Sequence, residues 1–164
     1  MYPRITRPIE SADTLADFGV ESSLLRRLGG MHAAGLISAF VLPSTGLGST
    51  LPPVVAYYTL ACSIVRGSAG SQLPAIWLDG RVHPDMRRRG IGDAVLFDAL
   101  GRCVDSTSTV AAAGILCSTD SAKASAWLCA RSFTNLDDAA PYPRRHWLPI
   151  KVARLACDGA YGDE

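Results

Sequence analysis

Lysine is scarce in this sequence. Of 16 basic residues only Lys123 and Lys151 are lysine, and the other 14 are arginine. Charged residues make up 19% of the chain and the formal net charge is +1, which argues against a strongly basic nucleic-acid binder and against an acidic tail. Arginine presents a planar fork of donors that suits phosphate and carboxylate groups. The skew leaves anion recognition open, with arginine codons in a GC-rich genome as the alternative explanation.

Several other features are missing. No uncharged apolar run reaches the roughly 20 residues that span a bilayer, and the N-terminal MYPRITRPIESAD lacks the apolar core of a secretion signal. The five cysteines form no Cys-x-x-Cys pair and have no histidine at metal-ligand spacing, which disfavours a disulfide framework or a zinc site. With 48% hydrophobic residues a packed core is expected. We predict a reduced, cytoplasmic protein with one globular domain over residues 1–164 and no membrane contact.

Two stretches, 43–53 and 66–74, are rich in Gly, Ser, Thr and Pro and are predicted to be loops. Predicted helices and strands alternate along the rest of the chain. Predicted helices cover 22–34, 92–104 and 121–130; predicted strands cover 36–42, 54–65, 75–82, 110–117, a segment from Phe133, and 146–152. The apolar run 54–65 is expected in the middle of a sheet. On helix 92–104, Asp93, Asp98 and Arg102 are predicted to face solvent. This order predicts the α/β class, with a mixed central sheet flanked by helices.

The most informative segment is VHPDMRRRGIGD, residues 82–93. Gly90 and Gly92 stand between a predicted strand and the clearest predicted helix, where the backbone can approach a ligand closely. The first turn of a helix offers unpaired N–H groups and a positive dipole end to an anion. Three arginines precede it, so the segment predicts a phosphate or pyrophosphate site at 87–93. Neither the P-loop pattern nor the third glycine of the dinucleotide fingerprint is present.

The run V-x-P-x-x-R-x-x-G-I-G resembles the acetyl-CoA signature of the GCN5-related N-acetyltransferases (GNAT), with Arg87, Gly90 and Gly92 in the motif positions. The resemblance implies the GNAT fold, an acetyl-CoA (coenzyme A) cofactor, and a loop whose amides hold its pyrophosphate. It implies that the main chain of the strand ending at Val82 hydrogen-bonds the pantetheine arm of the cofactor. The residues that it places at the pyrophosphate are Arg87, Arg88, Arg89, Gly90, Ile91, Gly92 and Asp93.

The resemblance extends to the branch of this family that acts as toxins in toxin–antitoxin operons. The segments that carry it are ADFGVESSLLRRL, VVAYYTLACSIV, LFDALGRC and HWLPIKV. It implies transfer of an acetyl group to a primary amine, with the α-amine of aminoacyl-tRNA as the favoured acceptor and a small amine or a protein N-terminus as alternatives. It also implies a homodimer and a ribbon-helix-helix antitoxin. Candidate RNA contacts are the arginines at 26–27, 87–89 and 144–145.

One departure from the family pattern bears on catalysis. Relatives carry a Tyr after the fifth strand that protonates the departing thiolate, and here that position is Leu128, which has no proton to give. An alkyl thiolate leaves tolerably near neutral pH, so the loss slows transfer without forbidding it. The groups that could substitute are Tyr142, Cys129, Cys117 and Ser132. The alternative function is a weak or inactive GNAT-fold module that binds acetyl-CoA or a protein partner.

Two residues are candidate catalytic groups. Asp79, within the strand before the loop, is the candidate general base, and its alternative role is that of a strand-end residue beside Gly80. Tyr142 is the candidate acid, and its alternative role is to pack the turn between Pro141 and Pro143. His83 could titrate near neutrality, but a solvated turn is the favoured interpretation.

Overall fold

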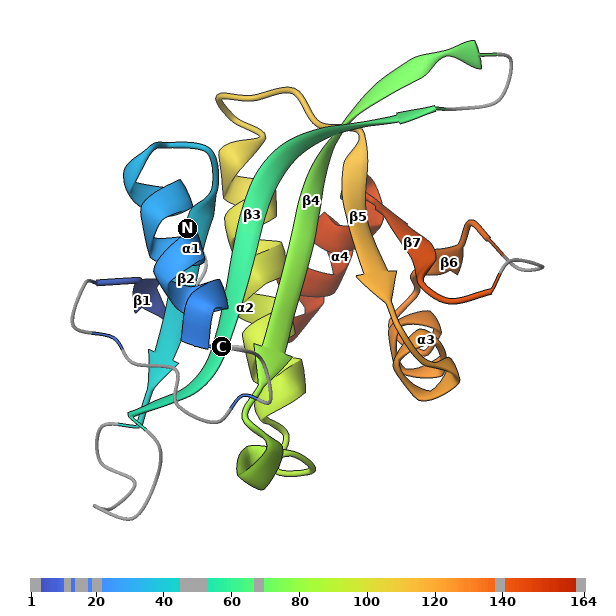
Figure 1. The fold of residues 1–164 in the computed structure, drawn as a ribbon. Coiled ribbons are helices and arrows are strands. Elements are labelled where there is room, and N and C mark those ends of the chain that lie inside the picture. Colours follow the sequence, from blue (N-terminus) through green and yellow to red (C-terminus); the bar gives the residue numbers. More distant parts are fainter. Residues whose placement is uncertain are drawn as a thin grey trace. The chain divides into compact units, whose positions relative to one another are not determined.

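A computed structural model describes residues 4–10, 13, 18, 22–44, 53–66, 70–137 and 141–161. A seven-stranded mixed sheet has the order β1-β2-β3-β4-β5-β7-β6 (Figure 1). The strands are β1 (Arg7–Pro8), β2 (Ser38–Pro43), β3 (Val54–Arg66), β4 (Gln72–Val82), β5 (Gly114–Thr119), β6 (Thr134–Asn135) and β7 (Arg144–Pro149). The helices are α1 (Ser22–Ala33), the 3-10 turn η2 (Pro84–Met86), α2 (Ile91–Ser106), α3 (Ala122–Cys129) and α4 (Ile150–Tyr161). The predicted α/β class is confirmed.

The residues form two compact units. The N-terminal unit comprises Pro3–Ala61 and Gly80–Ala99, and the C-terminal unit comprises Met1–Tyr2, Cys62–Asp79 and Leu100–Glu164. Strands β3 and β4 and helix α2 have residues in both units.

In the N-terminal unit the first three strands are antiparallel. Arg7 pairs with Val41, and β2 pairs with β3 from Ser38 and Leu60 to Pro43 and Val54. Helix α1 packs beside β2. The apolar core on this side consists of Phe18, Val41, Val54 and Tyr57, with Ile9 and Leu28 against it.

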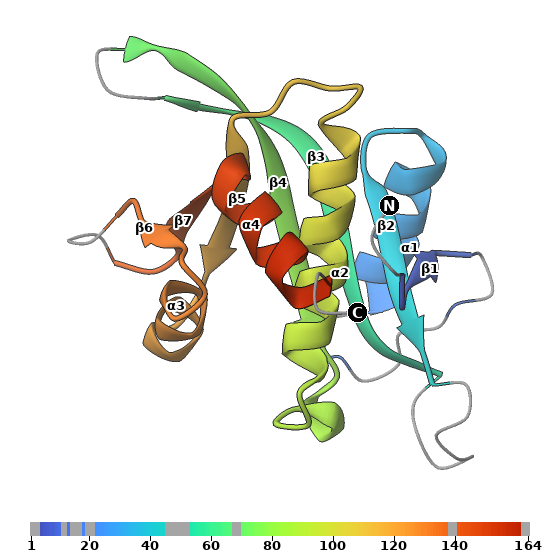
Figure 2. The same cartoon turned by 180° about the vertical axis from the view of Figure 1, so that it is seen from behind.

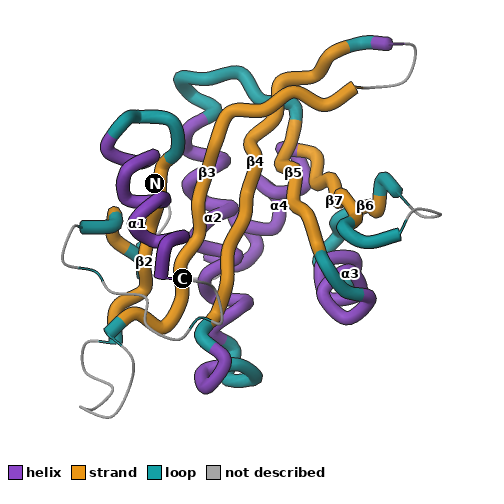
Figure 3. The backbone as a smooth tube through the Cα atoms, viewed as in Figure 1, coloured by secondary structure: helices purple, strands orange, loops and turns teal. Residues whose placement is uncertain are grey.

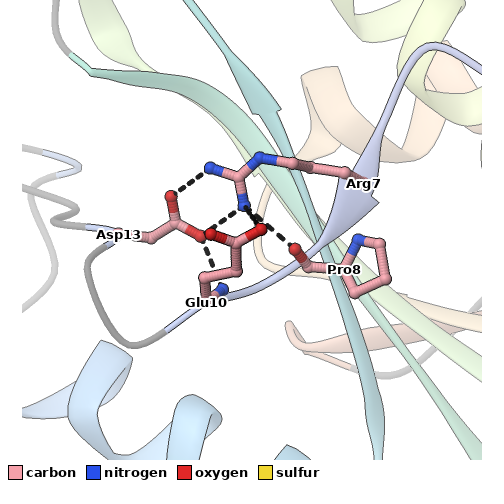
Figure 4. Close-up of polar contacts among 4 residues, drawn as sticks. All are labelled: Arg7, Pro8, Glu10 and Asp13. Atoms are coloured by element: carbon pink, nitrogen blue, oxygen red, sulfur yellow. Dashed lines mark hydrogen bonds and ion pairs between the residues drawn. The ribbon is translucent and has the colours of Figure 1, made fainter.

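A polar corner fixes the chain just after β1 (Figure 4). Arg7 donates to both carboxylate oxygens of Asp13, at 2.6 and 2.9 Å, and the Glu10 amide donates to Asp13 at 2.7 Å. The pKa of Asp13 is raised by partial burial but lowered more strongly by these hydrogen bonds, so it lies below its usual range. The pairing raises the pKa of Arg7. The corner is held by charge-assisted bonds.

Asp98 corrects a prediction. It was expected to face solvent, but it is only 1% exposed on α2. Its carboxylate accepts hydrogen bonds from the Tyr58 hydroxyl at 2.5 Å, the Thr6 hydroxyl at 2.6 Å and the Ile5 amide at 2.8 Å. The buried carboxylate is tolerated because donors surround it, and it ties residues 5 and 6 to α2.

In the C-terminal unit β5 is the middle of three paired strands. It runs parallel to β4 over Ala75–Leu78 and Gly114–Cys117, and antiparallel to β7 from Gly114 and Pro149 to Thr119 and Arg144. Helix α4 packs against β5 and β7, as Figure 2 shows, and α3 packs against β5, β6 and β7. A Cβ at Gly114 would collide with the Trp147 ring, so glycine permits this close packing.

Several predicted boundaries were wrong. Residues 150–152 belong to α4 and not to a strand, because Ile150, Ala153 and Cys157 lie along one helical stripe, of which Ala153 and Cys157 are fully buried. The strand predicted from Val110 begins at Gly114, and residues 72–74 of a predicted loop belong to β4. Most of the loop predicted at 43–53 lies outside the described residues. No helix among the described residues is long and apolar enough to cross a membrane.

Candidate cofactor-binding loop

The loop predicted to hold an anion lies between β4 and α2. Strand β4 ends at Val82, and the His83 amide donates to the Val55 carbonyl of β3 at 2.8 Å, which anchors the strand end. The turn η2 follows, with Met86 buried at 2% exposure. The Arg87 guanidinium donates back to the Val82 carbonyl at 3.4 Å. The segment from Val82 to Arg87 is therefore held by hydrogen bonds at both of its ends.

The backbone of the loop turns through two left-handed residues. Arg88 has φ of 62° and Gly90 has φ of 77°. A left-handed conformation strains any residue with a Cβ, which explains the glycine at 90. The Gly90 carbonyl accepts from the amides of Asp93 and Ala94, each at 3.1 Å, and so begins α2.

The loop leaves a row of amides available. Within the described part of the chain, the amides of residues 88–92 have no hydrogen-bond acceptor. The Asp93 amide is already bonded to Gly90. Of the residues predicted to hold the pyrophosphate, Arg87 and Asp93 thus have engaged amides, since the Arg87 amide donates to the Pro84 carbonyl at 3.3 Å. The first turn of a 16-residue helix adds the positive end of its dipole to the free amides.

Positive charge is concentrated at the same place. Arg87, Arg88 and Arg89 are exposed, and none of the three forms an ion pair with a described residue. A cavity of about 470 Å³ adjoins Arg89. Its lining residues are Ile5, Leu42, Pro43, Val55, Met86, Arg89 and Ile91. The geometry can therefore bind an anionic group beside an apolar surface.

His83 is not a solvated turn residue, as was expected. It is 4% exposed, and its ring lies edge-on to Phe18 with 5.2 Å between the centroids. Its Nδ1 accepts from the Asp85 amide at 3.3 Å, while its buried Nε2 has no hydrogen-bond partner among the residues that the structure describes. The ring helps to set the turn from β4 into η2.

Asp79, the candidate base, is exposed and follows the last parallel pair of the sheet, Leu78 with Cys117. The parallel pairing of β4 with β5 ends at Leu78, so Asp79 is the first residue of β4 beyond the segment that pairs with β5. Burial, then the charges of Cys103 and Asp79, raises the pKa of Cys117 far above its usual range. Cys117 holds its proton too tightly to serve as an efficient acid.

The other candidate acids are dispersed. Tyr142 is half-buried, and the Arg144 guanidinium lies 4.6 Å from its ring centroid, as expected of an aromatic side chain that packs the turn. Cys129 and Ser132 are exposed at the end of α3, whereas Leu128 is buried at 5% exposure. The structure places Asp79 on β4 and Tyr142 in the turn before β7.

Sequence reasoning missed one polar pair, Ser125 of α3 and His146 of β7, which are 2.8 Å apart. The two lie 21 positions apart in the chain, and no local spacing signals their contact. The sequence places a histidine in a predicted strand, but its burial is known only from the structure. Among the described residues, no group of three or more His, Cys, Asp or Glu side chains could hold a metal ion.

Solved toxin structures are similar to this chain in fold. A Tyr-to-Phe variant of the AtaT toxin, bound to the C-terminus of the antitoxin AtaR and to acetyl-CoA, matches with a TM-score of 0.74 at 19% identity over 92% of this chain and 96% of that one. The KacTA–DNA complex matches with a TM-score of 0.72 at 22% identity over 93% and 98%. AtaT complexed with acetyl-methionyl-tRNAfMet matches with a TM-score of 0.69 at 18% identity over 92% and 97%.

The chain has the fold of the GNAT toxins. This confirms the fold implied by the Arg87-x-x-Gly90-x-Gly92 resemblance, including a loop between a central strand and the following helix. No protein-family model and no curated protein matches the sequence. The likeness therefore rests on three-dimensional structure.

Proposed function

We propose that this protein is an acetyl-CoA-dependent N-acetyltransferase that acetylates the α-amine of aminoacyl-tRNA, as a translation-blocking toxin. The observation that carries the proposal is the loop at 87–92. Toward the described residues, its amides at 88–92 have no acceptor and its three arginines have no ion-pair partner, and the loop opens a 16-residue helix. A pyrophosphate would accept hydrogen bonds from these amides and would neutralise the charge of the three arginines.

The residues present fit the cofactor. The amides of 88–92 and the helix dipole would hold the pyrophosphate, while Arg87, Arg88 and Arg89 would neutralise it. The main chain at Val82 would meet the pantetheine arm. Once bound, acetyl-CoA supplies an activated acetyl group as a thioester, and the protein has to orient it and remove a proton from the amine.

Asp79 is the candidate for that proton transfer. It is an exposed carboxylate at the point where β4 separates from β5, so an incoming amine or a bridging water can reach it. Leu128, at the position of the family's acid, is buried and has no proton to donate. We propose that the thiolate leaves without an efficient donor, and that Tyr142 contributes little.

The acceptor and the partners are supported by the neighbouring structures. AtaT has been observed with an acetylated methionyl-tRNA and with the C-terminus of its antitoxin. By analogy, we propose aminoacyl-tRNA as the substrate class and an antitoxin as the regulator of this chain.

A second function is favoured by one observation. Leu128 is an apolar residue buried in α3, so the proton donor of the family has been replaced by core packing. A module that binds acetyl-CoA without turnover would show this combination of an intact loop and a lost acid.

The test is titration calorimetry of the folded protein with acetyl-CoA and, separately, with coenzyme A, followed by transfer of labelled acetyl groups to aminoacyl-tRNA. Binding with transfer is the expected result. Binding without transfer to tRNA, amines or peptides selects the second function. Absence of binding by the folded protein rejects both.

A further inference from the structure

The last residue of β5, Thr119, has a buried hydroxyl group. Thr119 is 7% exposed, and its Oγ1 has no hydrogen-bond partner among the residues that the structure describes. A buried hydroxyl without a hydrogen bond costs free energy, and valine would fill a similar volume without that cost. The Thr119 hydroxyl is therefore available to an atom of a bound ligand.

Thr119 lies beyond the part of β5 that pairs with β4. The parallel pairs of these two strands end at Leu78 with Cys117, whereas the antiparallel pairs of β5 with β7 continue to Thr119 with Arg144. On its β4 side, Thr119 thus has no strand partner within the described part of the chain. Asp79, the candidate base, also follows the last pair of β4 with β5. The candidate base and the free hydroxyl therefore belong to the segments that follow the same last pair.

The side chain of Thr119 is on the face of the sheet that α3 covers. Cys117 and Thr119 share a face because side chains alternate along a strand. Cys117 pairs with His146, whose ring contacts Ser125 of α3. Leu128, at the position of the family's acid, lies one helical turn after Ser125 and is also buried. Strand β5 leads directly into α3 (Figure 3), so the free hydroxyl is on the side of the sheet where the acid is missing.

We propose that the Thr119 hydroxyl donates a hydrogen bond to the thioester sulfur of the cofactor and stabilises the thiolate that departs. This role rests on the proposed acetyl transfer. As the amine nitrogen bonds to the acetyl carbon, the carbon–sulfur bond breaks and its electron pair passes to sulfur. Asp79 takes the proton that the amine loses. Thr119 keeps its own proton, because an aliphatic hydroxyl is a weaker acid than a thiol, and it acts as a fixed donor toward the developing charge.

Two other groups on this face are less suited to the role. The Ser125 hydroxyl lies 2.8 Å from Nε2 of His146 and is engaged in that buried contact. The Cys117 thiol is a weak hydrogen-bond donor. Thr119 instead combines a hydroxyl, burial and the lack of a partner among the described residues. A hydrogen bond from such a site to a charged sulfur is strong, because little water competes for either group.

Unfolding in urea tests whether the hydroxyl is free in the folded protein. Thr119→Val should leave the unfolding midpoint unchanged or raise it, because no hydrogen bond within the fold is lost. Thr6→Val is the matched control. Thr6 is also 7% exposed, but its hydroxyl contacts Tyr58 and Asp98, so its substitution should lower the midpoint. A Thr119→Val variant whose midpoint falls as far as that of Thr6→Val overturns the proposal.

A titration of bound coenzyme A tests the contact with sulfur without turnover. The ultraviolet absorbance of the thiolate is followed against pH, and the absorbance of the protein alone is subtracted. The bound thiol should titrate about one pH unit lower in wild type and in Thr119→Ser than in Thr119→Val, because a hydrogen bond to the charged form favours that form. The titratable residues of β4, β5, α3 and β7 are the same in all three proteins.

The outcomes of this titration separate the two proposals. Equal titration midpoints in wild type and Thr119→Val reject the role of Thr119 and leave the proposed function in place. Absence of coenzyme A binding by the folded wild type rejects the proposed function and, with it, the role of Thr119.

Steady-state acetyl transfer to aminoacyl-tRNA gives a further readout. Thr119→Val should lower kcat by about tenfold and change the affinity for acetyl-CoA little, because the hydrogen bond strengthens as charge develops on sulfur. Thr119→Ser should keep most of the wild-type kcat. If Thr119→Ser loses as much as Thr119→Val, the shape of the side chain and not its hydroxyl matters, and the proposal is wrong.

Discussion

The hydroxyl of Ser125 lies 2.8 Å from Nε2 of His146, and both residues are buried, at 7% and 0% exposure. The other ring nitrogen, Nδ1, lies 3.2 Å from the Arg144 carbonyl oxygen, which can only accept. Nδ1 therefore carries the proton in the neutral ring, and the Ser125 hydroxyl donates to Nε2. The pair joins α3 to β7 in the C-terminal unit.

Ser125→Ala should lower the free energy of unfolding by about 1–3 kcal/mol, because it leaves Nε2 of a fully buried ring without a donor. Ser118→Ala, at a half-buried serine of β5 whose side chain forms no hydrogen bond with a described residue, should change it by less than about 0.5 kcal/mol. Urea unfolding of both variants makes the comparison. Equal effects would show that the Ser125 bond contributes nothing.

Asp98→Asn should destabilise the fold by about 3 kcal/mol, because charge-assisted bonds from buried donors are lost and an amide N–H faces other donors. Thr6→Val keeps the shape of the side chain and removes one hydroxyl that contacts both Tyr58 and Asp98, so a smaller loss of about 1–2 kcal/mol is expected. Chemical denaturation measures both. If Asp98→Asn leaves the free energy of unfolding unchanged, the hydrogen bonds to Asp98 do not hold the N-terminal segment.

Asp137 should make stability depend on pH. Hydrogen bonds from the Arg145 side chain and amide lower the pKa of Asp137 to about 2. A lowered folded-state pKa stabilises the protein above the ordinary aspartate pKa near 4, and this contribution is lost as pH falls from about 4 to about 2. Because Arg145 is about half exposed, we expect no more than about 1 kcal/mol at neutral pH.

The measurement is the difference in unfolding free energy between wild type and Asp137→Asn over that range. The difference should shrink toward zero near pH 2. Asp120→Asn, at an exposed position after β5 without an ion pair to a described residue, is the matched control variant. A difference that stays constant as pH falls would contradict the assignment.

Tyr142→Phe should reduce acetyl transfer less than tenfold. The Tyr142 ring already packs beneath Arg144 in the turn before β7, and Phe retains that contact. Steady-state rates at saturating acetyl-CoA measure the effect. A larger loss with unchanged acetyl-CoA affinity would make Tyr142 the acid.

Most helices and strands could be predicted from the sequence, because the length and spacing of apolar runs determine them, as in β3 and α2. It failed where tertiary partners override a local pattern. Asp98 lies in a helix with an apolar stripe, and donors distant in the sequence, the Ile5 amide and the Thr6 and Tyr58 hydroxyls, make its burial tolerable. The loop at 87–92 was predictable because glycine spacing and helix onset are local. The Ser125–His146 contact was not, since it depends on how α3 packs against β7.

Gly90→Asp should abolish acetyl-CoA binding, and Gly35→Asp should not. Both glycines have positive φ, 77° and 69°, and neither has an atom within 4 Å of the position of an added Cβ. The two substitutions therefore impose similar backbone strain, while only Gly90 lies between the arginines and α2. A carboxylate there repels the pyrophosphate and occupies its place. Titration calorimetry on both folded variants measures the affinity. Equal affinity for both would remove residues 87–92 as the cofactor site, whereas equal loss would show that strain alone, and not the anion site, governs binding.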